Sequence, residues 1–150
     1  MVNISMLFRR KRNILILVGG NKNKIEPFIL AGKELNLEVT TASFSELNYR
    51  SFGGGFILKV NDIDLKHFSH IYIRMVGKRL EDSTLVVYYA KKHGIKVIDS
   101  LYNNSLLMPS SLGKSVEMMK LISKDIPMPK TIFGSVDYLS KNAVKELGFP

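Results

Sequence analysis

The chain has 150 residues, of which 45% are hydrophobic, and a formal net charge of +9. At this length folding buries roughly 70% of the surface of the extended chain, so the composition predicts one domain with one core. The sequence contains no cysteine, which excludes disulfide bonds, thiolate metal sites and cysteine nucleophiles and is typical of a cytoplasmic protein.

Residues 1–12 are predicted to form a basic N-terminal extension. The apolar residues 1–8 precede the tract Arg9-Arg10-Lys11-Arg12, which is the reverse of the order in a secretory signal. The tract has no interleaved aromatic residues, so it does not favour nucleic-acid binding. The apolar run at 14–18 is far shorter than the roughly 20 residues that cross a bilayer, and no membrane partner is expected. The remaining positive charge fits an anionic ligand such as a nucleotide, or solubility only.

The first elements read as a β-α-β unit. Residues 13–18, between Arg12 and Gly19, are continuously apolar after Asn13, as in a strand that is buried on both faces of a parallel sheet. A helix comes next, because apolar or small residues recur at helical spacing at Ile25, Phe28, Ile29, Gly32 and Leu35. Residues 39–42 form the next predicted strand.

The middle of the chain continues this alternation. Glycines 53–55 separate two short segments within residues 49–64, which predicts a hairpin-like excursion. Residues 71–76 are the next core strand, residues 83–93 a helix closed by Gly94, and residues 97–98 a further strand. Alternating strands and helices predict a doubly wound α/β domain with a mostly parallel sheet flanked by helices.

The C-terminal segment is predicted to be helix, extended linker, strand and helix. A short helix beginning near Lys114 ends before Pro127 and Pro129, which exclude the α conformation in the residues that precede them. Residues 131–133 read as a brief strand. Ser135 then caps a helix that Gly148 closes, with an apolar side formed by Val136, Leu139, Ala143 and Leu147. If that side stays exposed, it would invite dimerisation.

Polar residues come after the predicted strands at one edge of the sheet, where ligands of open α/β sheets bind. These candidates are Gly19, Gly20, Asn21, Arg74, Asp99 and Asn103. The loop at 19–22 has neither the dinucleotide-binding nor the P-loop spacing, so it is either an ordinary tight turn or a loop that lets a ligand approach the backbone. Arg74 interrupts an apolar strand and must reach a carboxylate or open solvent.

Lys114 is the most informative charge in the sequence. A cation in the first turn of a helix opposes the helix dipole by a few tenths of a kcal/mol up to about 1 kcal/mol, and a bound anion would reverse that effect. A solvated surface lysine is the alternative. The three histidines do not suggest a metal site, and no catalytic or metal-ligating residue is predicted.

Three local motifs together carry a resemblance to a known family. They are the lysine that opens a helix, the segment Ile-Pro-Met-Pro-Lys-Thr at 126–131, and the ending Leu-Gly-Phe-Pro at 147–150. This combination resembles the junction before the ATP-binding domain of ATP-grasp ligases, above all ribosomal-protein glutamate ligases and glutathione-synthetase-like enzymes. The resemblance is sharpest over residues 103–150. It implies a Rossmann-like pre-ATP-grasp domain at 13–126 and, at 127–150, the linker and first strand and helix of a truncated ATP-grasp domain.

The resemblance also implies roles for the candidates. Such ligases phosphorylate a carboxylate with magnesium-bound ATP and let an amine attack the acyl phosphate. Lys114 would contact the nucleotide phosphates, although Gly113 stands where the family has aspartate. The edge at 19–21 and Arg74 would face a small-molecule or peptide substrate that carries a carboxylate or an amine.

The residues that complete catalysis in this family are expected in a further ATP-grasp domain beyond Pro150. The chain by itself is therefore predicted to be inactive and to hold no cofactor tightly. The alternative is a stand-alone, non-catalytic α/β module that binds a small anionic metabolite or a partner protein.

Overall fold

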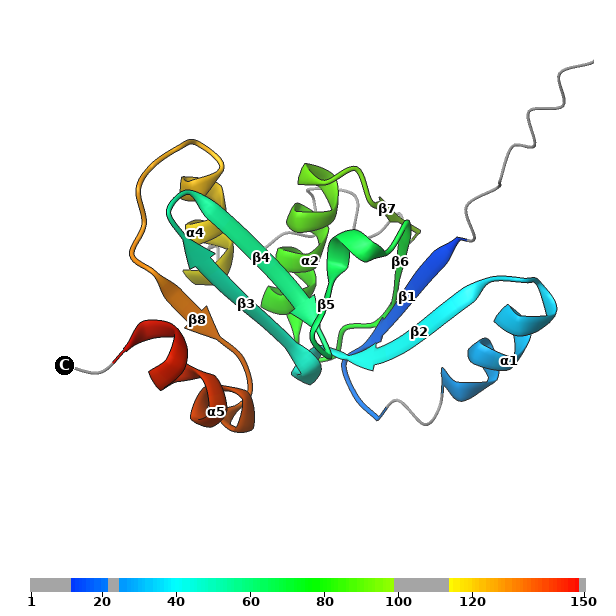
Figure 1. Cartoon of the computed structure of the whole chain (residues 1–150). Coiled ribbons are helices and arrows are strands. Elements are labelled where there is room, and N and C mark those ends of the chain that lie inside the picture. The colour runs from blue at the N-terminus through cyan, green and yellow to red at the C-terminus, as the bar shows by residue number, and fades with distance from the viewer. Residues whose placement is uncertain (1–11, 22–24, 99–113, 149–150) are drawn as a thin grey trace, which may run out of the picture.

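The structure is a computed structural model that describes residues 12–21, 25–98 and 114–148 (Figure 1). Its strands are β1 (Asn13–Val18), β2 (Glu38–Ser43), β3 (Leu47–Phe52), β4 (Gly55–Val60), β5 (Ile63–Asp64), β6 (His70–Met75), β7 (Lys96–Val97) and β8 (Thr131–Phe133). Its α-helices are α1 (Glu26–Glu34), α2 (Leu80–Lys92), α4 (Lys114–Ile122) and α5 (Val136–Leu147). The elements predicted from the sequence are therefore present, with small shifts at their ends.

One sheet is parallel and has the strand order β2-β1-β6-β7. The strand β1 pairs with β2 along its whole length and with β6 from Ile14 to Val18, and β6 pairs with the short β7. Leu15 and Leu17 point to one face of this sheet, while Ile16 and Val18 point to the other, and all four are buried. The prediction of a strand covered on both faces is confirmed, and the mixed α/β class with it.

A second sheet is antiparallel and has the order β5-β4-β3-β8; the sequence predicts its β3–β4 hairpin but not the sheet as a whole (Figure 1). The turn between β3 and β4 places Gly53 and Gly54 at φ values of +44° and +85°, which glycine adopts without the strain a β-carbon would cause. On the other side of β3 lies β8, a strand from the C-terminal segment. The pairing of β3 with β8 thus joins segments on either side of the predicted domain boundary at residue 127.

The buried side chains form two clusters rather than the single core expected from chain length. The larger cluster lies between one face of the parallel sheet, helices α2 and α4, and the inner face of the antiparallel sheet. Tyr89 of α2 is fully buried there, 6.2 Å from the ring of Phe56. The smaller cluster lies under α1. A sheet with helices on both faces buries apolar residues on each face, which accounts for the second cluster.

Helix α2 begins three residues earlier than predicted. Ser83 reads as a start signal in the sequence, but its hydroxyl donates to the carbonyl oxygen of Leu80 at 2.8 Å, inside the first turn. Arg79 precedes the helix and forms an ion pair with Asp82 at 2.8 Å. The first turn is thus stabilised by local polar side-chain contacts, which the spacing of apolar residues does not predict.

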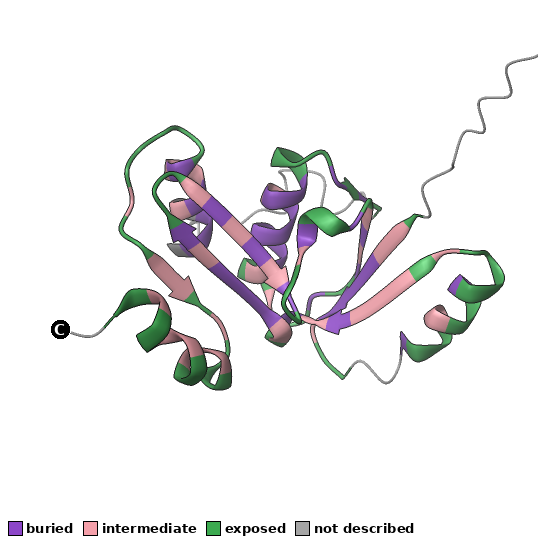
Figure 2. Cartoon of the chain, in the orientation of Figure 1, coloured by how far each residue is buried: buried purple, intermediate pink, exposed green. Residues whose placement is uncertain are grey.

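The two C-terminal helices differ in burial (Figure 2). Helix α4 packs through Val116, Met119 and Ile122, as the apolar spacing predicts. Helix α5 has no buried residue, and Val136 is 82% exposed. Its Ser135 cap is confirmed, since the Ser135 hydroxyl accepts from the amide of Tyr138 at 3.2 Å. Much of its apolar side therefore remains exposed.

Candidate functional site

The carboxyl ends of β1 and β6 lie side by side at one edge of the parallel sheet. The amide of Gly19 donates to the carbonyl oxygen of Met75 at 2.5 Å, just beyond the last paired residues of the two strands. The predicted loop at 19–21 and the predicted residue Arg74 are thus brought to the same edge, as parallel pairing requires. This edge is one candidate site.

The two glycines of this loop have different surroundings. A β-carbon at Gly19 would lie 2.1 Å from the carbonyl oxygen of Val76, so only glycine fits against the backbone at the end of β6. A β-carbon at Gly20 would meet no atom within 4 Å, and Gly20 is exposed. Packing therefore explains Gly19 as part of a close turn, whereas the Gly20 and Asn21 backbone lies at the open surface.

The guanidinium of Arg74 lies over an aromatic ring, and among the described residues it pairs with no carboxylate. Its central carbon is 4.9 Å from the centroid of the Phe28 ring, which belongs to α1, and the side chain is exposed. A cation at this distance is attracted by the face of the ring, by about 0.5–1 kcal/mol at an exposed site. The contact orients the guanidinium and leaves its donors accessible to an anionic group.

The other predicted residues give less structural information. Asp99 and Asn103 lie outside the described residues. Lys114 is the first residue of α4, as predicted, but its side chain lies outside the described part of the chain. In the next position the Ser115 hydroxyl donates to Glu81 of α2 at 2.8 Å, so the first turn of α4 already has a carboxylate beside it. That carboxylate interacts favourably with the positive end of the helix dipole.

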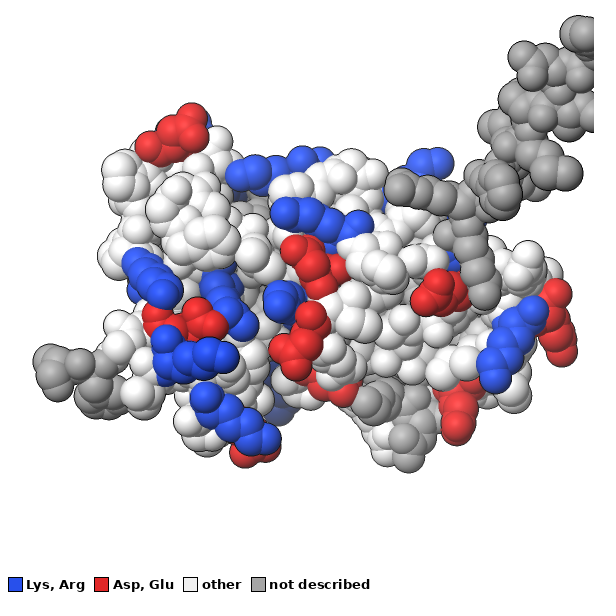
Figure 3. Space-filling view, viewed as in Figure 1, with Lys and Arg blue, Asp and Glu red and all other residues white. Residues whose placement is uncertain are grey.

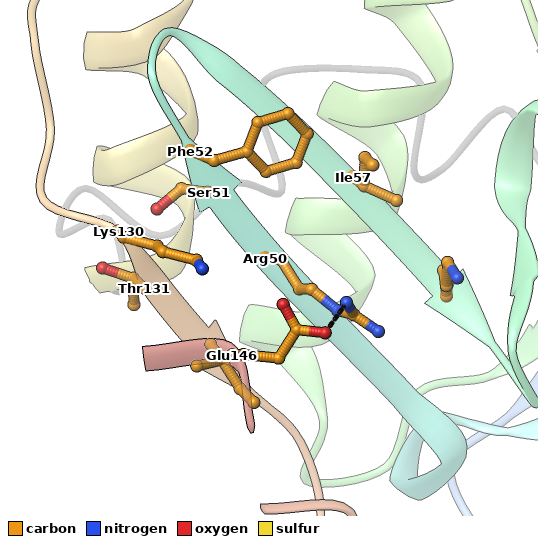
Figure 4. Close-up of a pocket in the computed structure, with 9 residues that line it drawn as sticks. Arg50, Ser51, Phe52, Ile57, Lys130, Thr131 and Glu146 are labelled. Atoms are coloured by element: carbon orange, nitrogen blue, oxygen red, sulfur yellow. Dashed lines mark hydrogen bonds and ion pairs between the residues drawn. The ribbon is translucent and has the colours of Figure 1, made fainter. Parts of the chain in front are cut away.

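A second candidate site is a pocket of about 250 Å³ on the outer face of the antiparallel sheet, beside α5 (Figure 4). Arg50 of β3 connects the two elements: its Nε donates to the Tyr138 hydroxyl at 2.9 Å, and its Nη1 forms an ion pair with Glu146. Burial lowers the pKa of Arg50, but Tyr138 and Glu146 outweigh that effect and raise it overall, so the guanidinium stays charged.

The lining of this pocket combines cationic, apolar and small polar side chains. Three basic residues line it against one acidic residue, together with small polar and apolar side chains; they are Arg50, Ser51, Phe52, Ile57, Lys59, Lys130, Thr131, Ile132 and Glu146. Figure 3 shows Lys and Arg side chains gathered around a smaller acidic patch over the part of the surface where the antiparallel sheet and α5 lie. The formal charge of the lining is +2, which favours an anionic ligand.

Sequence reasoning missed this pocket because its residues come from three separate segments. Arg50 and Lys59 do alternate with buried residues along β3 and β4, which is the pattern of an outward face. Their proximity to Lys130 and Glu146, however, depends on the pairing of β8 with β3. The alternation could have identified the basic face, but not the pocket.

In the part of the chain that the structure describes, no group of three or more histidine and acidic side chains could hold a metal ion, and no helix is both long and apolar enough to cross a membrane. His67, His70 and His93 make separate local contacts, with Asn13, Ser69 and Tyr89 respectively.

Comparison with models of protein families, with curated proteins and with solved structures found no match to this chain.

Proposed function

We propose that this chain is the N-terminal, substrate-side domain of an ATP-dependent carboxylate–amine ligase of the ATP-grasp type. The observation that carries the proposal is the sheet edge where the Gly19–Gly20 loop and Arg74 meet, on a parallel sheet with helices on both faces. The C-terminal order of elements, with a helix from Lys114, an extended Pro-x-Pro segment, a strand and a helix, agrees with the junction in these ligases. We also propose that the α/β domain is Rossmann-like. The segment from residue 127 onward is, in this proposal, the first part of a truncated ATP-grasp domain.

Each residue at the edge has a defined task in the proposal. The exposed backbone of Gly20 and Asn21 lies where a substrate can approach it closely. Arg74, oriented by Phe28, offers a planar set of donors that matches a substrate carboxylate. Lys114, at the first turn of α4, would bind the nucleotide phosphates, where it would neutralise negative charge together with magnesium. Such neutralisation is the main contribution that proteins make to phosphoryl transfer.

The proposal predicts that this chain does not bind nucleotide tightly, because most nucleotide contacts would come from the ATP-binding domain. Calorimetric titration of the 150-residue chain with Mg-ATP is expected to show weak binding or none. Tight binding of one nucleotide per chain would contradict the proposal, since it would require a complete nucleotide site within these residues.

The role of Arg74 can be tested in the natural enzyme. Arg74→Gln is expected to raise the KM for the carboxylate or amine substrate at least tenfold, which is the loss expected for one charge-assisted hydrogen bond. The KM for ATP should stay unchanged. Lys78→Gln is the matched control, because it removes one exposed positive charge from the neighbouring turn. Equal effects of both variants on the substrate KM would mean that Arg74 acts only through its charge.

The second candidate function is a stand-alone α/β module that binds a small anionic metabolite and performs no catalysis. It is favoured by the cationic pocket between the antiparallel sheet and α5, whose described lining residues all belong to this chain. The two proposed functions can be distinguished by the sequence that each predicts after Pro150. A cytoplasmic location is part of both proposals.

A further inference from the structure

The pocket beside α5 lies on a different sheet from the edge proposed for the ligase substrate. It is built on the outer faces of β3, β4 and β8, whereas the Gly19 and Arg74 edge belongs to β1 and β6. A ligand in this pocket would therefore be additional to the proposed substrate.

The cations of the pocket outnumber the anions that accompany them. Glu146 is paired with Arg50, and within the described part of the chain neither Lys59 nor Lys130 has a hydrogen-bonding or ion-pair partner for its ammonium group. In Figure 4 the Lys130 side chain extends towards Arg50 and Glu146, so its charge adds to theirs within one small space. The lining therefore carries a net positive charge, which favours the binding of an anion.

Glu146 shows which chemistry the pocket accepts. Its carboxylate is held by the Arg50 guanidinium, and Tyr138 fixes the guanidinium from the other side by accepting from Nε. The pocket thus already holds one carboxylate, supplied by α5. Arginine and lysine together are suited to carboxylate and phosphate oxygens.

The size of the pocket restricts the ligand. A volume of about 250 Å³ is below the 300–1,000 Å³ typical of pockets for drug-sized ligands, so the pocket favours a small ligand. The apolar part of the lining, formed by Phe52, Ile57 and Ile132, offers space for a short hydrocarbon segment.

We propose that this pocket is a binding site for a small dianionic metabolite, a dicarboxylate or a phosphate monoester, whose charge is held by Lys59 and Lys130 beside the Arg50–Glu146 pair. The two negative charges of such a compound balance the formal charge of +2 on the lining. The site does not depend on the ligase proposal, because all of its residues lie in this chain.

The proposal is tested by recording ¹H–¹⁵N spectra of the 150-residue chain during titration with succinate, with inorganic phosphate and, as a singly charged comparison, with acetate. Ionic strength is held constant with sodium chloride, because exposed charges are screened by salt. The amides of Ser51, Lys59 and residues 130–132 are expected to shift with a saturable dependence on the dianions, while α1 amides stay unchanged. Acetate should bind at least tenfold more weakly. Succinate and phosphate together decide which dianion chemistry the site prefers.

Substitution of the lysines then tests the location. Lys130→Gln and Lys59→Gln should each weaken dianion binding about tenfold, the size of one charge-assisted hydrogen bond. Lys33→Gln is the matched control: it removes the same charge from an exposed position on α1 and should leave binding unchanged. Far-ultraviolet circular dichroism verifies that each variant is folded.

Two results would overturn the proposal. One is the absence of any saturable shift at the pocket with either dianion at millimolar concentration. The other is a loss of binding in the Lys33 variant that equals the loss in the pocket variants, since this would show attraction to net charge without a site. Neither result depends on whether the chain belongs to a ligase.

Discussion

The Gly19→Ala substitution tests how closely the two central strands approach each other at the candidate edge. The added β-carbon would lie 2.1 Å from the carbonyl oxygen of Val76 and 3.1 Å from that of Met75. Both are backbone atoms at the end of β6 and cannot rotate away as a flexible side chain would. The strands must therefore separate, which also lengthens the hydrogen bond from Gly19 to Met75.

The cost of this separation can be estimated from packing. Forcing an extra carbon into a filled space typically destabilises a protein by about 1–3 kcal/mol, and contact with backbone favours the upper end of that range. A loss of about 3 kcal/mol would lower the ratio of folded to unfolded protein roughly 100-fold. For a domain of this size it corresponds to a decrease in Tm of about 6–12 °C.

The neighbouring glycine provides a matched control. The Gly20→Ala substitution meets no atom within 4 Å, so its free energy of unfolding should stay within about 0.5 kcal/mol of the parent. Urea unfolding followed by far-ultraviolet circular dichroism measures both variants, since the chain has no tryptophan for fluorescence. Equal stabilities of the Gly19→Ala and Gly20→Ala variants would refute the close approach of β1 and β6.

Three further predictions concern the second sheet and the surface. Leu58→Ala should destabilise the fold by about 2–5 kcal/mol in urea unfolding, because Leu58 is fully buried between the antiparallel sheet and the larger core; a change below about 1 kcal/mol would place it at the surface. In a double-mutant cycle, Arg50→Gln and Glu146→Gln should show a coupling of about 1 kcal/mol, whereas additive effects would mean that α5 is not attached through this pair. Burial, followed by the ammonium groups of Lys66 and Lys92, lowers the pKa of His93 below 6.5 in the folded state. The unfolded chain therefore binds this proton more readily, and the stability that His93 contributes is present above pH 6.5 and lost as the pH falls below it. Thermal unfolding between neutral pH and about pH 5 should show a smaller loss for His93→Gln than for the parent, and an unchanged pH dependence would contradict the shift.

The parallel sheet could be predicted because its signals are local. A continuous apolar run at 13–18 specifies a strand buried on both faces, and helical spacing specifies the helices that cover it. The start of α4 at Lys114 and the Ser135 cap of α5 can also be read from neighbouring residues. Each of these features depends on residues within one or two turns of chain.

The antiparallel sheet could not be predicted in the same way. Strand β8 has three residues, and so short a segment does not specify its partner. Its stacking of Phe133 on Tyr49, at 4.8 Å between ring centroids, joins residues that are far apart in sequence. The pocket could not be predicted for the same reason, because Arg50 contacts Tyr138 and Glu146 only when β8 is paired with β3.

The candidate edge was predicted in part. The adjacency of the Gly19 loop and Arg74 results from parallel pairing, which the apolar strands specify. The contact of Arg74 with Phe28 cannot be read from the sequence, because the helical pattern assigned that ring to the core. A strand-end arginine therefore needs the position of the covering helix before its partner can be named.

The proposal that this chain is a ligase domain is tested most directly by sequencing the natural transcript beyond the codon for Pro150. If the chain is the substrate-side domain of an ATP-grasp ligase, the codons after Pro150 should encode an apolar strand ending in lysine and then a glycine-rich loop. A stop codon immediately after Pro150 would contradict that claim and favour the stand-alone binding module.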